Sequence, residues 1–140
     1  MRTMALDVGQ KAIGIAVSDP LGWGPSLLTT IRRTSLRADL EALAALAAEH
    51  GVEEMVVGYP LNMDGSVGPA ARRMDRLIEE IRSVLSQPIH RMDERLSTQE
   101  AFEKISQRRH LDRKTRRRQR DEVAAAIILQ RYLEKEPPLD

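Results

Sequence analysis

The sequence predicts an α/β fold with a mixed five-stranded sheet and helices on both faces, in the order β-β-β-α-β-α-β-α-α. Two observations lead to this prediction. Three short apolar runs stand close together at the start of the chain, as in an antiparallel meander, and later apolar runs alternate with segments of helical period. The chain has 140 residues, and no repeat or interior linker divides it, so a single domain over residues 1–140 is expected.

The first three strands are expected at Met1–Asp7, Ala12–Ser18 and Leu27–Arg32. Gly9 lies between the first two, and a positive φ at this glycine would allow the tight reversal of a β-hairpin. Prolines and glycines at 20–25 mark the turn that leads to the third strand. Three consecutive strands favour an antiparallel start to the sheet.

The apolar period then changes to that of a helix over Ser35–His50, where Ser35 can act as the N-cap and Gly51 ends the helix. Met55–Gly58 is a short, uninterrupted apolar run, which is typical of a central parallel strand covered on both faces. The loop at Tyr59–Gly68 follows this strand. Ligand sites in such sheets lie beyond the carboxyl ends of the strands.

The second half of the chain continues the alternation. A helix over Pro69–Leu85 precedes a weakly signalled fifth strand at Ile89–Met92. A capping box that begins at Ser97 starts a helix that is expected to end near Gln107. The basic segment after it is expected as a loop or frayed helix, and the last helix is predicted over Asp121–Lys135, with Ala124, Ala125, Ile128 and Leu129 facing inward.

Composition excludes several classes of protein. Hydrophobic residues make up 41% of the chain, too many for wholesale disorder, and aromatic residues only 3%, too few for a surface that stacks several bases on rings. The chain has no cysteine, which excludes disulfides, thiol nucleophiles and cysteine-based zinc sites. No apolar run approaches the ~20 residues of a membrane span, and no signal-peptide pattern opens the chain. A soluble, cytoplasmic protein without a membrane partner is expected.

The net charge of +1 hides a strong asymmetry. The basic segment, residues 104–120, contains nine lysines and arginines against Asp112 alone, so it carries +8 and the remaining residues carry −7. A basic patch on an acidic body is typical of a polyanion-binding surface, and the alternative is a solvated loop without a partner.

Three acidic positions follow or precede predicted elements. Asp7 ends the first strand, Asp93 and Glu94 follow the fifth, and Asp121 opens the last helix. Each alone could be a turn residue, a surface ion pair or a helix cap. Together, Asp7, Glu94 and Asp121 could converge at one sheet edge as an all-oxygen site suited to Mg²⁺ or Mn²⁺. Two such ions, about 3.5–4 Å apart, can activate water and stabilise the leaving oxygen of a phosphodiester.

Four segments together resemble the YqgF/RuvX family of RNase H-like nucleases, which is related to the Holliday-junction resolvases. They cover nearly the whole chain in the right order and are LDVGQKAIGIAVSD (Leu6–Asp19), VVGYPLNMDGSVG (Val56–Gly68), DERLST (Asp93–Thr98) and DEVAAAIILQRYL (Asp121–Leu133). One departure is Ala12, which stands where the family usually has arginine, so one phosphate contact is absent.

The resemblance implies an RNase H-like fold and a metal-dependent nuclease whose catalytic and metal-binding acids map to Asp7, Glu94 and Asp121. Asp93 adjoins Glu94, and because side chains alternate along a strand only one of the two can point into the site; Glu94 is favoured. Residues expected to bind the nucleic acid are Lys11, Asn62, Arg95, Arg109, Arg113, Lys114, Arg116, Arg117, Arg118 and Arg120.

The resemblance leaves two substrates open. Maturation of the 5′ end of pre-16S rRNA ranks first, and resolution of branched DNA by a homodimer that makes two symmetric cuts is the alternative. From the residues alone, a nucleic-acid-binding protein without catalysis also remains, as does an actin-like or sugar-kinase-like ATPase, although that architecture normally needs two such lobes.

Overall fold

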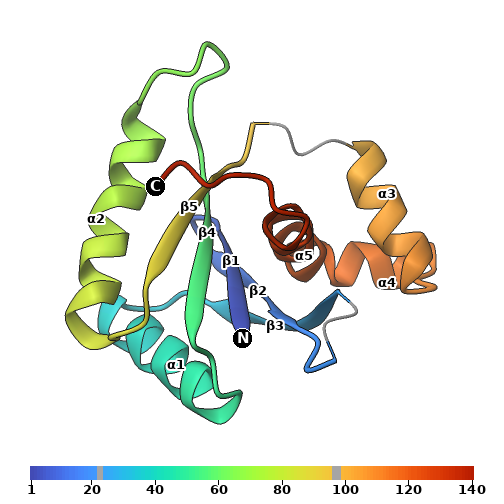
Figure 1. The fold of residues 1–140 in the computed structure, drawn as a ribbon, viewed down its shortest axis with the longest axis horizontal. Helices are drawn as coiled ribbons and strands as arrows, with labels where there is room; N and C mark the ends of the chain where they lie inside the picture. The colour runs from blue at the N-terminus through green and yellow to red at the C-terminus, as the bar shows by residue number, and fades with distance from the viewer. Residues whose placement is uncertain (22–23, 96–98) are drawn as a thin grey trace.

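The computed structural model describes residues 1–21, 24–95 and 99–140 (Figure 1). The described elements form the predicted α/β fold, with one helix more than expected. The strands are β1 (Thr3–Val8), β2 (Ala12–Ser18), β3 (Pro25–Arg32), β4 (Glu54–Tyr59) and β5 (Ile89–Asp93). The helices are α1 (Leu36–Glu49), α2 (Pro69–Val84), α3 (Gln99–Arg108), α4 (Arg113–Arg118) and α5 (Arg120–Leu133).

The five strands form one mixed sheet in the order β3-β2-β1-β4-β5. β1, β2 and β3 pair antiparallel, as the meander predicts, whereas β4 pairs parallel with β1 on one side and with β5 on the other. The carboxyl ends of β1, β4 and β5 therefore lie at the same edge of the sheet. This is the edge at which the acidic positions were expected to meet.

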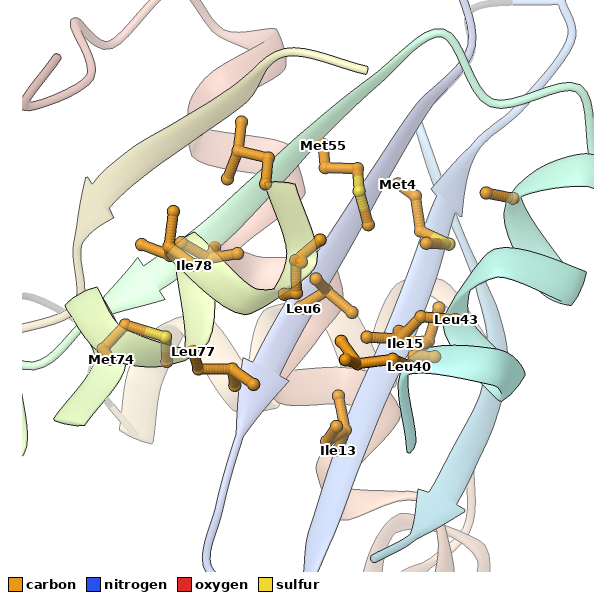
Figure 2. Packing of buried hydrophobic residues seen from close by; sticks show 14 of the residues in the cluster. Met4, Leu6, Ile13, Ile15, Leu40, Leu43, Met55, Met74, Leu77 and Ile78 are labelled. Carbon is orange, nitrogen blue, oxygen red and sulfur yellow. The ribbon is translucent and has the colours of Figure 1, made fainter. Parts of the chain in front are cut away.

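Helices cover both faces of the sheet, so the alternating side chains of each strand enter two cores. One core joins Leu6 and Ile15 to Leu43 of α1 and Ile78 of α2 (Figure 2). The other core is formed mainly by α5 and α3, and the strands contribute smaller residues to it, among them Ala5 and Ala16. Small side chains allow α5 to pack close to the middle of the sheet, and this closeness positions the site.

Two local expectations hold at the first helix. The Ser35 side chain accepts a hydrogen bond from the Ala38 amide at 3.1 Å and so caps α1, and Gly51 has a φ of +60° after its end. At the hairpin, Gly9 does not have the expected positive φ. The turn instead closes through a bond of 2.8 Å from the Gly9 amide to the Ala12 carbonyl oxygen, so the strands reverse without a left-handed residue there.

The second half of the chain departs from the prediction at two places. Residues 113–118 form the short helix α4 rather than a loop or frayed helix, because Asp112 caps it by accepting a bond of 2.7 Å from the Thr115 amide. On α5, Ala124 is only half-buried, whereas Val123 and Ala126 are fully buried. The predicted cap at Ser97 lies outside the described residues. No helix in the described ranges is long and apolar enough to cross a membrane.

Candidate active site

Asp7 lies near the carboxyl end of β1, on the face of the sheet covered by α5. Met4 and Leu6 enter the core under α1 and α2, and Ala5 enters the core under α5. Because side chains alternate along a strand, Asp7 shares the face of Ala5. Asp7 is half-buried and stands opposite Gly14 in the antiparallel register of β1 and β2.

Glu94 follows β5 and reaches the same face over a glycine of β4. A Cβ on Gly58 would lie 2.9 Å from the Glu94 Oε1 and 2.7 Å from the Ile128 Cδ1, so the missing side chain leaves the space that the glutamate and α5 occupy. Burial, a hydrogen bond with Asp7 and the charge of that carboxylate together raise the pKa of Glu94 to about 8. Asp7 and Glu94 are thus adjacent carboxyl groups.

Asp121 is brought to this edge by the first turn of α5. A Cβ on Gly14 would lie 2.0 Å from the carbonyl oxygen of Asp121 and 2.8 Å from its Cβ, so the backbone of α5 rests directly on β2. Gly14 is also the cross-strand partner of Asp7. All three predicted acids therefore lie on one face at one sheet edge, with Asp7 and Glu94 in contact and Asp121 beside the strand that flanks Asp7.

Asp93 has a different role from its neighbour. Its carboxylate binds the guanidinium of Arg95 at 2.7–3.1 Å, and these bonds hold the pKa of Asp93 below its usual value. Arg95 also donates a bond of 3.2 Å to the Met63 carbonyl oxygen and lies against Gly65. Asp93 and Arg95 thus fasten the loop after β4 to the end of β5, and alternation leaves Glu94 for the site.

The donor set fits a divalent cation. Two adjacent carboxylates repel each other, which is one reason for the raised pKa of Glu94, and a bound divalent cation would offset this repulsion. Mg²⁺ and Mn²⁺ prefer oxygen ligands of this kind. In residues 1–21, 24–95 and 99–140, no group of three Asp, Glu or His side chains lies close enough together to hold a metal ion. Asp7 and Glu94 are thus in contact, whereas Asp121 stands at the same sheet edge without completing a three-ligand cluster.

The basic residues expected to bind nucleic acid divide into two groups. Arg116 forms an ion pair with Glu103 and so joins α4 to α3, and Arg109 is half-buried. The others have exposed side chains on α4 and at the start of α5; they are Arg113, Lys114, Arg117, Arg118 and Arg120. This exposed group lies on the same side of the sheet as α5, whose first turn holds Asp121 (Figure 1).

The two remaining predicted contacts stand on loops next to the acids. Lys11 is exposed in the turn between β1 and β2, four residues after Asp7. Asn62 is exposed in the loop after β4, where its side chain donates a bond of 2.9 Å to Ser66, and a Cβ on Gly68 would lie 2.6 Å from its Oδ1. Asn62 therefore supports the shape of this loop.

Sequence reasoning missed the two glycines that make room for the acids. Gly14 and Gly58 lie inside apolar strands, where a glycine weakens the strand unless another group approaches its backbone closely. That signal was present in the sequence, since each glycine interrupts a run of β-branched or aliphatic residues. A glycine in such a strand predicts that another group packs closely against the strand backbone, but it does not identify that group.

Comparisons with known proteins show which family the chain resembles. The family model described as "RuvX: Holliday junction resolvase" matches residues 1–135. A Moorella thermoacetica protein named "Putative pre-16S rRNA nuclease" is 49% identical over 135 residues, with 96% of each chain covered. A Myxococcus xanthus protein of the same name is 47% identical over 140 residues, which cover all of this chain and 92% of that one.

Solved structures of low identity share the fold. Thermus thermophilus RuvC in complex with a Holliday junction substrate superposes with a TM-score of 0.60 at 13% identity, with 99% of each chain covered. The fowlpox virus resolvase in complex with Holliday junction DNA gives a TM-score of 0.60 at 10% identity, with 96% of this chain and 98% of that one covered. The fold is thus that of RuvC-like, RNase H-fold nucleases.

Proposed function

The chain belongs to the RuvX family and is a nuclease that hydrolyses phosphodiester bonds, and we propose that its substrate is pre-16S rRNA, which it matures at the 5′ end. The observation on which the proposal depends is the adjacent pair of carboxyl groups, Asp7 and Glu94, at the carboxyl edge of the parallel strands. Bacteria make precursor rRNA in the cytoplasm, so the proposal also places the protein there.

In this proposal Asp7, Glu94 and Asp121 hold one or two Mg²⁺ or Mn²⁺ ions. Such ions supply positive charge that lowers the pKa of water and stabilises a leaving oxygen. The protein contributes the positions of its ligands. Gly58 admits Glu94 over β4, and Gly14 sets the distance of α5 from β2 and with it the position of Asp121.

The basic surface next to Asp121 supports nucleic acid as the substrate. Phosphate contacts from lysine and arginine position a strand without reading its sequence. We assign this role to the exposed cations of α4 and the start of α5, Arg113, Lys114, Arg117, Arg118 and Arg120, together with Lys11. Arg109 and Arg116 are assigned only the positive potential that they add, and Asn62 and Arg95 hold the loop beside the acids.

The test is cleavage of a pre-16S rRNA fragment that contains the 5′ precursor sequence. We expect the wild-type protein to cut it with Mg²⁺ or Mn²⁺ and not with EDTA. Asp7→Asn should abolish cleavage while the fragment still binds, because the basic surface is unchanged. Glu41→Gln is the control, since Glu41 forms only an exposed pair with Arg37 on α1. Full activity of Asp7→Asn would contradict the assignment of this site.

Resolution of branched DNA is a second candidate function, favoured by the description of the family model that matches the chain. A resolvase of this kind would cut a four-way junction symmetrically as a homodimer. Cleavage of a four-way DNA junction, compared with the rRNA fragment at equal concentration, distinguishes the two. Paired symmetric cuts in the junction, with the rRNA fragment left intact, would favour junction resolution.

A further inference from the structure

A groove of about 700 Å³ opens beside Glu94. Its walls are the turn after β1, the start of α1 and the N-terminal half of α2, and Glu94 lines it at the sheet edge. α1 and α2 cover one face of the sheet, and α5 and α4 lie on the other side (Figure 1). The groove has walls from α1 and α2, so it lies across the sheet from α4. None of the predicted nucleic-acid contacts lines it.

The uncompensated charge of the groove is positive. Arg33 is tied to Asp39 at 3.1 Å and to the Gly9 carbonyl oxygen at 3.0 Å, and this pairing also neutralises Asp39. Arg73 and Arg76 line the groove from α2 and are exposed, and neither guanidinium has a hydrogen-bond or ion-pair partner within the described ranges. Residues three apart on a helix are neighbours on its surface, so the two cations form one patch.

The rest of the lining suits a backbone rather than bases. Among the described residues, no aromatic side chain lines the groove, so they offer no platform on which bases could stack. Its polar side chains come from the three arginines, from the Thr34–Ser35 segment before α1, and from Gln10, Asp39 and Glu94. Arg33 neutralises Asp39, so Glu94 is the one carboxyl group without a basic partner among the described lining residues. Exposed arginines of this kind suit an extended phosphate backbone, which is held through charge rather than through base stacking.

We propose that this groove binds the sugar–phosphate backbone on one flank of the scissile phosphate, with Arg73 and Arg76 contacting its phosphates. The inference rests on the proposed nuclease function. The strand then runs from the groove, past Glu94 and Asp7, toward the cations of α4 on the other side of the sheet. Two separate basic surfaces on either side of the acids thus hold the two flanks of the cut.

The first experiment measures binding of a fluorescein-labelled, single-stranded RNA from the 5′ precursor region at several salt concentrations, in EDTA. The variant is Arg73→Gln/Arg76→Gln. The matched control is Arg37→Gln/Arg82→Gln, which also removes two charges, one from α1 and one from α2. Both arginines lie outside the groove and form exposed pairs. We expect the groove variant to bind more weakly and its salt slope to fall by about 1.4, or ~0.7 for each lost contact, while the control keeps the wild-type slope.

The second experiment asks which part of the substrate the groove contacts. Once the wild-type cut is mapped, the fragment is shortened on one flank and then on the other. The groove variant should lose affinity only with fragments that retain one particular flank, and Arg117→Gln/Arg118→Gln only with those that retain the other. This reciprocity is a readout that a general loss of stability would not produce.

Three outcomes would overturn the inference. If the groove variant had the same RNA affinity and salt slope as Arg37→Gln/Arg82→Gln, the groove would have no role in binding RNA. A changed oligomeric state by light scattering, with unchanged RNA affinity per chain, would make it a contact between copies. Failure of the wild-type protein to cleave any fragment would overturn the proposed function as well, whereas normal cleavage with an indifferent groove variant would overturn this inference alone.

Discussion

The carbonyl oxygen of Asp121 lies where a side chain on Gly14 would be, 2.0 Å from the position of its Cβ. Gly14 is also the cross-strand partner of Asp7. One glycine therefore links two of the three acids, because it fixes how closely the first turn of α5 approaches the strand next to Asp7. The spacing of the acids depends on a missing side chain as much as on the acids themselves.

Gly14→Ala should therefore damage both stability and activity. The new methyl group would overlap backbone atoms, which cannot move as the end of a flexible side chain can, so α5 must shift. Overpacking of this kind costs about 1–3 kcal/mol of unfolding free energy. Thermal denaturation measures the loss, and cleavage should fall further than the unfolded fraction explains, since Asp121 is displaced.

Gly9→Ala on the same hairpin is the graded control. Its Cβ would lie 3.2 Å from the Ala12 carbonyl oxygen, a tight contact that a shift of a few tenths of an ångström relieves. We expect a smaller loss of stability and near-normal cleavage. Equal damage from the two substitutions would show that close packing on Gly14 has no special role.

The sequence allowed the acids to be predicted, because each stands where a strand ends or a helix begins. Strand alternation predicted that only one of Asp93 and Glu94 points toward Asp7, and did not by itself say which. The structure places Glu94 against Asp7 and Asp93 against Arg95. Contacts between distant segments could not be predicted in this way. That Asp121 rests on Gly14 depends on the angle at which α5 crosses the sheet, and no local pattern encodes that angle.

The basic segment illustrates the same limit. Its charge could be counted in the sequence, but its division could not, because the pairing of Arg116 with Glu103 requires α3 and α4 to meet. The groove beside Glu94 was missed for a related reason. Arg73 and Arg76 resemble any exposed helical arginines until α1, α2 and the turn after β1 are brought together.

Glu94→Gln should reduce cleavage far more than Asp93→Asn. The amide cannot ionise to share a cation with Asp7, and a loss of at least ~100-fold is expected, the lower end of what a positioned acid or base contributes. Asp93→Asn keeps an oxygen toward Arg95 and leaves the pair intact. Initial rates on the rRNA fragment measure both. A larger loss of cleavage from Asp93→Asn than from Glu94→Gln would assign Asp93, and not Glu94, to the active site.

The metal-free protein should become less stable, relative to Glu94→Gln, as the pH rises from about 4.5 to about 8. Burial raises the pKa of Glu94 from 4.5 to about 8, so the folded protein keeps a proton that the unfolded chain has already released. The stabilisation is complete below pH 4.5 and is lost through pH 8. Melting temperatures in EDTA at several pH values measure the difference, and parallel curves for the two proteins would contradict it.

Arg95→Ala should loosen the loop after β4 without unfolding the protein. It removes the bond to the Met63 carbonyl oxygen and the partner of Asp93, and ion pairs near the surface contribute little to global stability. Amide hydrogen exchange at 62–66 should accelerate. Arg72→Ala is the control, since Arg72 bonds the same loop only at the Val67 carbonyl oxygen, at 3.3 Å. If hydrogen exchange in the loop were unchanged in Arg95→Ala, Arg95 would not be what holds the loop to the end of β5.

The arginines of α4 should separate into binding and structural residues. Arg117→Gln/Arg118→Gln should lower the salt slope of RNA binding by about 1.4 and leave the melting temperature unchanged, because both side chains are exposed. Arg116→Gln should lower the melting temperature instead, since it leaves Glu103 without its partner between α3 and α4. If Arg116→Gln alone changed the salt slope as much as the double variant, Arg116 would have to leave Glu103 and contact RNA on binding. The separation into binding and structural arginines would then be wrong.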